Sequence, residues 1–277
     1  MSFELHPART VDEAVALLAR LGDDAMVLAG GTAFALLWKQ GLIRPAHVVD
    51  IHGAAELRGI ARLPDGGLRI GALATHRDAE RHPAVASYCP ALAETFGHVA
   101  TIRIRNQATV GGNLAHADPA QDPPVMLLAL DGVAVARSSR GERRIPLASF
   151  FIDLMTSSLA PDELLTEVVL PPLAAGTRAV YRKFLPRTAD DYATVSVAAV
   201  RSAEGGVRVA LGSVAATPVR AGACERALAG GASPAEAAPL VDEAIDPLDD
   251  ARGSADYKRR MARVWAERAL LEVTGAH

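Results

Sequence analysis

Two Gly-Gly turns limit most strongly what this chain can fold into and bind. They lie at Gly30-Gly31 and at Gly111-Gly112. A glycine pair lets backbone N–H groups approach a ligand with no side chain in the way. Two such turns facing each other can hold a diphosphate from both sides, because helix N-termini and successive N–H groups bind anions. A lone Gly-Gly pair is more often only a turn. Together, however, the two pairs indicate a dinucleotide ligand held by backbone.

The residues around the second pair add side chains that suit such a ligand. Asn113 can present an amide to a phosphate or a ring oxygen. Asp122 precedes two prolines, which gives a rigid place to aim a carboxylate at a ribose or a flavin edge. Asp122 equally suits the N-cap of a helix. The residues alone leave both roles open.

Common nucleotide motifs are missing from the sequence. It has no G-x-G-x-x-G, which disfavours a Rossmann site, and no G-x-x-x-x-G-K-[ST], which excludes a P-loop of the standard form. The formal net charge is −3, only three lysines occur, and the arginines are dispersed. We therefore expect no nucleic-acid partner.

Length and composition set broader limits. The 277 residues suffice for one large domain or two ordinary ones. No run of about 18 apolar residues occurs, so we expect no transmembrane segment. The N-terminus lacks the features of a signal peptide, which makes the cytoplasm the expected location. Cys89 and Cys224 are isolated, which excludes a four-cysteine iron–sulfur or zinc site built from this chain and favours buried, inert thiols.

The N-terminal pattern predicts alternating helices and strands. Thr10 and Glu13 form a capping box, and apolar residues follow at helical spacing. The first glycine turn comes between a strand and a helix capped by Thr32, so it lies where the helix dipole favours anions. The expected elements are helix 11–21, strand 26–29, helix 32–40 and strand 47–51.

The middle of the chain predicts strands and short helices. Pro123-Pro124 can open an apolar helix. Arg103 and Arg105 alternate along a segment that we expect to be extended and to face a partner or solvent. The expected strands are 68–73, 133–136 and 166–170, and the expected helical stretches begin at Thr75 and cover 91–100 and 125–130.

Pro171-Pro172 marks the expected domain boundary. Beyond it, Glu204-Gly205-Gly206 predicts a hairpin turn, and Tyr257, Met261, Val264 and Trp265 share one helical face. Strands followed by helices indicate an α+β module. The expected elements are strands 179–185, 194–201 and 207–215, then helices from about residue 222, with 230–247 as a loop that contains one short helix.

Other polar residues leave several roles open. His76 and His116 lie near the motifs and suit a proton relay or metal ligation, but no spacing supplies a second ligand, and a lone histidine is more often a satisfied polar residue. From its sequence context alone, Lys183 is expected to be an ordinary surface lysine on a strand that contains Tyr181-Arg182-Lys183-Phe184.

In five ordered blocks, the chain resembles the FAD-binding medium subunit of the molybdenum hydroxylases, the group of xanthine dehydrogenase and carbon monoxide dehydrogenase. The blocks cover nearly the whole chain and include Leu28-Ala29-Gly30-Gly31-Thr32 and Thr109-Val110-Gly111-Gly112-Asn113. They span residues 28–51, 70–76, 104–122, 187–199 and 252–260.

This resemblance implies an α+β fold. Its FAD-binding domain, 1–173, would consist of two α/β subdomains of the PCMH type, about 1–53 and 54–173, and a smaller α+β domain, 174–277, would follow. The flavin would receive electrons from [2Fe–2S] clusters on a separate small subunit, which take them from a molybdopterin centre on a large subunit. The resemblance further implies a heterohexamer.

The resemblance also implies the residues that bind FAD. Two loops would wrap the diphosphate, Asp122 would hydrogen-bond the cofactor, and two further residues would lie along the flavin. Ala33 departs from the family, which often has a polar residue there, so one possible side-chain contact is lost. The expected FAD-binding residues are Leu28, Ala29, Gly30, Gly31, Thr32, Ala33, Phe34, Thr109, Gly111, Gly112, Asn113, Asp122, Leu165 and Lys183.

Two other functions fit the same motifs. One is a self-contained FAD-dependent oxidoreductase of this fold, which the C-terminal module argues against. The other is a scaffold or maturation subunit without cofactor, which the intact glycine pairs argue against. We expect no residue of this chain to be catalytic in substrate hydroxylation and none to bind a metal. The sequence does not define the substrate of the complex or the electron acceptor, which could be NAD+, a quinone or oxygen.

Overall fold

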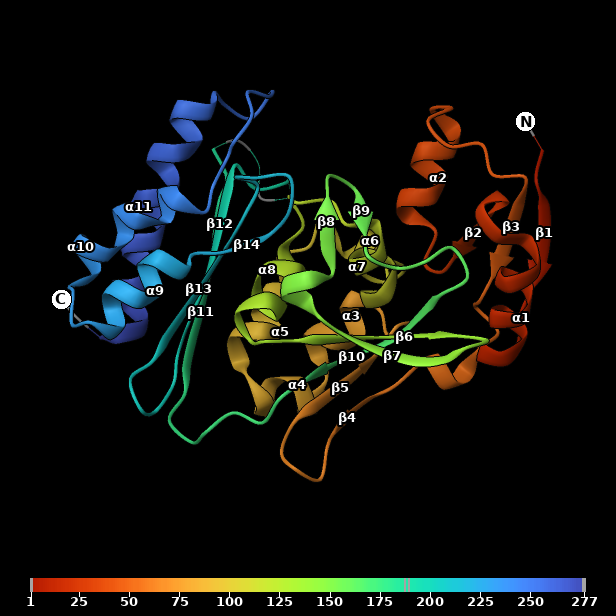
Figure 1. Ribbon diagram of the computed structural model, residues 1–277, viewed down its shortest axis with the longest axis horizontal. Coiled ribbons are helices and arrows are strands. Elements are labelled where there is room, and N and C mark those ends of the chain that lie inside the picture. The colour runs from red at the N-terminus through yellow and green to blue at the C-terminus, as the bar shows by residue number, and fades with distance from the viewer. Residues whose placement is uncertain (1, 187, 189, 276–277) are drawn as a thin grey trace.

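The computed structural model describes residues 2–186, 188 and 190–275. Three larger sheets follow one another along the long axis of the molecule, with helices packed on and between them (Figure 1), and a fourth sheet has only two short strands. This arrangement confirms the expected α+β class.

The N-terminal sheet is parallel, in the order β1-β3-β2. Its strands are β1 (Glu4–Pro7), β2 (Ala25–Leu28) and β3 (His47–Asp50). Helix α1 (Val11–Leu21) packs on the sheet through its apolar face, and α2 (Thr32–Lys39) follows β2. The Thr10 side chain accepts a hydrogen bond from the Glu13 N–H at 3.1 Å, as the capping box predicts. These elements place the first glycine turn at the carboxyl end of β2.

The middle sheet is antiparallel, in the order β4-β5-β10-β6-β7. Between it and the C-terminal sheet lie several short helices (Figure 1). Helix α8 is buried along its whole length, because it packs against the core on one side and β12 and β13 on the other. The strands are β4 (Ile60–Arg62), β5 (Leu68–Gly71), β6 (Val133–Ser138), β7 (Gly141–Pro146) and β10 (Leu164–Leu170), and the helices are α3 (His76–Arg81), α4 (Pro83–Tyr88), α5 (Pro90–Gly97), α6 (Ile102–Arg105), α7 (Val110–His116) and α8 (Asp122–Ala129).

The C-terminal sheet is antiparallel, in the order β11-β12-β13-β14. One face packs on α8, and the other is covered by the last helices around a separate apolar core (Figure 1). The strands are β11 (Arg178–Phe184), β12 (Val195–Arg201), β13 (Val207–Gly212) and β14 (Val219–Arg220), and the helices are α9 (Gly222–Ala229), α10 (Pro234–Ala237) and α11 (Ala255–Thr274).

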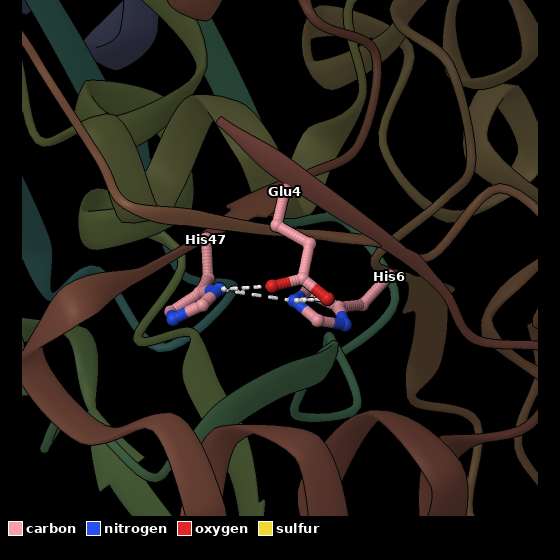
Figure 2. A group of neighbouring side chains, drawn as sticks. All are labelled: Glu4, His6 and His47. Atoms are coloured by element: carbon pink, nitrogen blue, oxygen red, sulfur yellow. Dashed lines mark hydrogen bonds and ion pairs between the residues drawn. The ribbon is translucent and has the colours of Figure 1, made fainter. Parts of the chain in front are cut away.

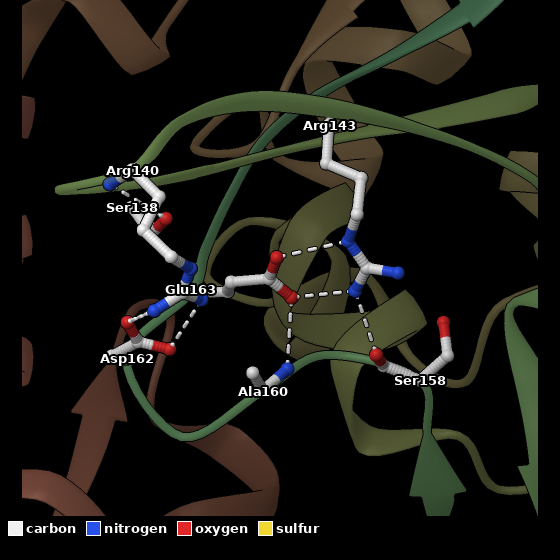
Figure 3. A network of polar contacts seen from close by, with 7 residues as sticks. All are labelled: Ser138, Arg140, Arg143, Ser158, Ala160, Asp162 and Glu163. Atoms are coloured by element: carbon white, nitrogen blue, oxygen red, sulfur yellow. Dashed lines mark hydrogen bonds and ion pairs between the residues drawn. The ribbon is translucent and has the colours of Figure 1, made fainter.

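An ion-pair network fixes the segment that leads into β10 (Figure 3). The Glu163 carboxylate accepts two hydrogen bonds from the Arg143 guanidinium, at 2.9 and 2.6 Å, and one from the Ala160 N–H at 2.8 Å. Arg143 also donates to the Ser158 carbonyl oxygen, and Arg140 pairs with Asp162. Arg143 on β7 and Arg140 in the turn before it thus hold residues 158–163 and set the start of β10, which carries Leu165.

Several predicted elements differ from those observed. Residues 102–105 form the short helix α6 instead of an extended segment, because Thr101 caps its first turn. The helix predicted to begin at Thr75 is α3, and α5 covers most of the predicted stretch 91–100. Between them, Pro83 starts a further short helix, α4, that was not predicted. The segment 230–247 contains α10 and a 3-10 helix, Ala238–Glu243. The strands β1, β4, β7, β8 (Phe151–Asp153) and β9 (Thr156–Ser157) were not predicted.

The buried face of helix α11 only partly coincides with the predicted apolar face of Tyr257, Met261, Val264 and Trp265. Met261 and Trp265 pack against the C-terminal core, but Val264 is exposed. The fully buried positions are mostly small residues that let the helix approach β12 closely: Ala262, Ala266, Ala269, Leu270 and Val273.

Candidate cofactor site

The first glycine turn leaves the N-terminus of α2 open. Gly31 caps the helix with a φ of +72°, a conformation that favours glycine. No side chain caps this end. The first backbone N–H groups of α2 are therefore free to donate to an anion, and the helix dipole favours negative charge there.

The two glycine segments meet in the structure. A Cβ atom at Gly30 would lie 2.0 Å from the Gln107 carbonyl oxygen, just upstream of the second turn. A Cβ atom at Gly112 would lie 3.8 Å from Ala29 Cβ in the first turn. The sequence motifs are thus brought side by side, with Leu28 at the end of β2 and Thr109 at the start of α7.

The N-terminus of α7 differs from that of α2, because its N–H groups already have partners. Val110 donates to the Ala74 carbonyl and Gly111 to the Ala72 carbonyl, both at 2.9 Å, and Gly112 donates to Thr109 Oγ1 at 3.1 Å. The expectation that both turns present free N–H groups is therefore wrong for the second turn. What α7 offers instead is the bare backbone of Gly112 and the side chain of Asn113.

Asn113 carries a buried polar atom without a partner. Its Oδ1 has no hydrogen bond among the described residues, and the residue is only 9% exposed. A buried acceptor left unpaired costs about 1–3 kcal/mol, so a donor on a bound ligand would satisfy it. This unpaired oxygen, on the residue after Gly112, can accept from a hydroxyl or N–H group of a bound dinucleotide.

A cavity of about 200 Å³ lies beside both turns. Gly30, Thr75, Gln107 and Thr109 line it, together with the Arg58 side chain. Ligand pockets typically measure about 300–1,000 Å³, so this cavity has room for only part of a dinucleotide. Arg58 and Gln107 were not singled out in the sequence, because only the folded chain brings them next to Gly30.

The remaining residues of the first loop have different surroundings. Thr32 and Ala33 begin α2 and are partly buried. The Phe34 ring packs edge-on against Phe3, with centroids 5.9 Å apart, so it lies against β1. The Phe34 side chain therefore helps to hold α2 in place, and only its backbone N–H is left to contact a ligand.

Asp122 lies in a buried cluster that joins α8 to β11. Its carboxylate accepts hydrogen bonds from the Tyr181 hydroxyl at 2.6 Å and the Lys183 ammonium at 2.9 Å, and Lys183 also donates to the His98 carbonyl at 3.0 Å. Asp122 is the first residue of α8 and Gln121 is its N-cap, so the N-cap alternative is wrong. The surface position expected for Lys183 is also wrong, because its side chain is 2% exposed.

Burial controls the charge state of this cluster. It raises the pKa of Asp122, which Lys183 and the Tyr181 hydroxyl oppose. It raises the pKa of Tyr181 well above its ordinary value, with the Asp122 charge adding to the effect. Tyr181 and Lys183 alternate on one strand and therefore share a face, a signal through which the sequence could have revealed Tyr181.

Leu165 and the two histidines complete the predicted residues. Leu165 is buried on β10, a strand that packs against α7. His76 is buried with both ring nitrogens unpaired, and burial followed by the charge of Arg105 lowers its pKa to about 4. Burial also lowers the pKa of His116. Neither belongs to the group of described residues placed for metal binding, and Cys89 and Cys224 are buried with raised pKa values, as expected.

Comparison with known proteins accounts for the whole chain. Residues 1–173 match the family described as the FAD binding domain in molybdopterin dehydrogenase, and residues 179–273 match the CO dehydrogenase flavoprotein C-terminal domain. The chain belongs to the FAD-binding medium subunits of the molybdenum hydroxylases. FAD is its cofactor, electron transfer is its role, and it is a subunit of an oxidoreductase.

Relatives of this family match along their full length. The carbon monoxide dehydrogenase medium chain of Hydrogenophaga pseudoflava is 36% identical over 276 residues, which cover 97% of this chain and 96% of the relative. The solved carbon monoxide dehydrogenase of that organism superposes with a TM-score of 0.94 at 37% identity, covering 99% and 98% of the two chains. Quinoline 2-oxidoreductase from Pseudomonas putida 86 gives a TM-score of 0.90 at 30% identity, covering 100% and 98%.

These relatives are named for different substrates, although the medium subunit is shared. The family match therefore gives the flavin role of this chain and does not identify a substrate. Among the described residues, no helix is long and apolar enough to cross a membrane.

Proposed function

We propose that the open N-terminus of α2 binds the FAD diphosphate, with the second turn lying against its other side. The free N–H groups of the first turn of α2, which includes Thr32 to Phe34, supply donors and a favourable dipole. Gly112 leaves room for the diphosphate beside Ala29, and Asn113 Oδ1 can accept from a hydroxyl or N–H group elsewhere on the cofactor. The N-terminus of α2 without a side-chain cap, near the glycine of the second turn, is the observation that carries the assignment.

We assign Asp122, Leu165 and Lys183 to the flavin side of the cofactor. The Lys183 ammonium and the Asp122 carboxylate are held rigidly by each other and by Tyr181 and His98. A rigid charged pair on two different elements is suited to orienting a ring system.

The chain's own residues then have to bind, orient and shield the cofactor. FAD supplies a carrier that takes up electrons one at a time and releases two. No general base of this chain is required, because substrate hydroxylation belongs to a different subunit. Two isolated, buried cysteines cannot hold a cluster, so the electrons have to arrive from another chain.

We assign the partners accordingly: a small subunit with [2Fe–2S] clusters and a large subunit with molybdopterin, assembled as a heterohexamer in the cytoplasm. Relatives named as medium chains or as subunits of dehydrogenase complexes support a multi-subunit assembly. We further assign 1–173 to FAD binding, with subdomains 1–53 and 54–173, and 174–277 to a smaller domain. The separate sheets and the core under α11 support this division. The core of the middle sheet extends to Tyr181, Ala198, Val200 and Ala210, so the C-terminal sheet packs closely on it.

An absorbance spectrum of the full chain, desalted after incubation with FAD, tests the proposal. We expect retained flavin bands at one FAD per chain and no turnover of organic substrates by the chain alone. Retained flavin with substrate turnover would favour a self-contained oxidoreductase. A folded chain that stays colourless, both alone and co-expressed with its partners, would favour a cofactor-free scaffold.

A further inference from the structure

A cluster of two histidines and one glutamate lies on the N-terminal sheet, away from the glycine turns (Figure 2). Glu4 and His6 alternate on β1 and so project from the same face. His47 lies on β3, directly opposite Glu4 in the parallel register. Strand geometry therefore brings together three metal-binding side chains that come from two distant parts of the sequence.

One ligand atom from each of the three side chains lies within 4.8 Å of the other two, and the two Glu4 oxygens each face one imidazole. His6 Nε2 and His47 Nδ1 lie 3.1 Å apart, His47 Nδ1 and Glu4 Oε2 lie 3.4 Å apart, and His6 Nε2 and Glu4 Oε1 lie 3.8 Å apart. Tetrahedral zinc with bonds of about 2.0–2.1 Å separates its ligand atoms by roughly 3.3 Å. The observed spacings bracket this value, so small side-chain rotations suffice to close the site.

Exposure leaves room for the fourth ligand that such a cation needs. The His6 and His47 side chains are 13% and 27% exposed, whereas Glu4 is 68% exposed. The imidazoles are thus held against the sheet, and the carboxylate side is open to water. Imidazole nitrogens favour zinc and similar transition metals over Mg²⁺ and Ca²⁺, which prefer oxygen ligands.

The site lies at the opposite end of the sheet from the cofactor turns. His47 pairs with Ala25 at the start of β2, whereas the glycine turn follows Leu28, which pairs with Asp50 at the other end. Strand β1 is at the edge of the sheet and pairs only with β3 among the described strands. A cation held by all three side chains would tie this edge strand to the sheet.

We propose that Glu4, His6 and His47 bind one divalent transition-metal cation of the zinc type, with water as a fourth ligand, and that the bound cation fastens β1 to β3. The site serves the stability of the N-terminal sheet and takes no part in electron transfer. It goes beyond the flavin function and does not depend on it.

The test is a Zn²⁺ titration of the full chain, free of any histidine tag and stripped of metal with a chelator, against a chromophoric zinc indicator. We expect one Zn²⁺ per chain and a higher melting temperature with Zn²⁺ than with the chelator. We expect His6→Ala and His47→Ala each to lower the zinc affinity. The loss should exceed the ~10–100-fold that follows when a residue that only hydrogen-bonds to a metal ligand is removed. The zinc-dependent rise in melting temperature should also vanish.

His52→Ala is the matched control. His52 also follows β3 and contacts a carboxylate, with Nδ1 2.6 Å from Asp50 Oδ1, but no third ligand joins that pair. This variant should keep the full zinc affinity. Substoichiometric zinc binding by the unmodified chain, or equal affinity in His6→Ala and the unmodified chain, would overturn the proposal. Flavin content, measured in parallel, reports on the FAD site separately.

Discussion

At the residue scale, the glycines of the two motifs serve different purposes. A Cβ atom at Gly111 would lie 2.5 Å from Ala72 Cβ, and one at Gly30 would lie 2.0 Å from the Gln107 carbonyl oxygen. These two glycines allow segments of the chain to pack on each other. A Cβ atom at Gly112 would meet Thr109 Oγ1 at 2.9 Å and would point toward the first turn. Of these three, only Gly112 lies where a side chain would enter the space between the turns.

His76 makes stability depend on pH. Burial lowers its pKa from the ordinary 6.5 to about 4. Between these values the unfolded chain binds more protons than the folded one, so its contribution to stability is complete above pH 6.5 and is lost as the pH falls toward 4. For a shift of this size, the free energy of unfolding falls by about 2 kcal/mol between pH 7 and pH 5.

The variant His76→Leu should remove this part of the pH dependence. Because both ring nitrogens are unpaired, we expect the variant to be as stable as the parent at pH 7 and more stable at pH 5. Urea unfolding at the two pH values measures the difference, with His52→Ala as an exposed control. A His76→Leu variant with the parent's pH dependence would refute the assignment to His76.

At the element scale, a buried ion pair joins helix α8 to strand β11. Asp122 and Lys183 are 6% and 2% exposed in their side chains. Removing one member of a buried pair leaves an uncompensated charge in the interior, which destabilises the fold. Replacing both members by neutral groups leaves no buried charge and avoids this cost. The pair therefore defines how the C-terminal sheet docks on the helix next to the cofactor site.

We predict that Lys183→Met lowers the free energy of unfolding by about 3–5 kcal/mol. The double variant Asp122→Asn/Lys183→Met should recover most of this loss, since the asparagine can still accept from Tyr181. Urea unfolding of both single variants and the double variant, without added FAD, gives the coupling energy. Additive losses would mean that the two side chains act independently.

The sequence predicted elements well where local signals decide them. The Thr10 side chain caps α1, although the Glu13 carboxylate accepts from the Arg9 N–H and so does not complete the predicted capping box. The turn at Gly205 joins β12 and β13 as predicted. The sequence-based prediction failed where contacts with neighbouring elements determine the local structure. The segment with Arg103 and Arg105 was predicted to be extended. The Arg105 guanidinium instead donates hydrogen bonds to Glu80 and to the carbonyl oxygens of Val99 and Ala100, which favours the short helix α6.

At the scale of the whole molecule, the site depends on contacts that no local pattern contains. From the sequence and its resemblance, both glycine turns, Asn113, Asp122 and Lys183 are predicted to bind FAD, and this stays a prediction. The sequence did not reveal that Asp122 and Lys183 bind each other, because they lie on different elements and meet only when α8 packs on the C-terminal sheet. The cluster of Glu4, His6 and His47 was missed for the same reason, since it needs the register of β1 and β3.

The most direct test of the account is the flavin content of Gly112→Val. A branched side chain at this position would strike the Thr109 hydroxyl and fill the space beside Ala29. Gly206→Val is the matched control, since Gly206 lies in an exposed hairpin turn where a Cβ atom meets only Ser202 Oγ, at 3.6 Å. Both variants would be incubated with FAD, desalted and compared by flavin absorbance, with circular dichroism to establish folding. We predict that folded Gly112→Val retains no flavin, while Gly206→Val retains one FAD per chain; full flavin content in Gly112→Val would contradict the placement of the diphosphate between the two turns.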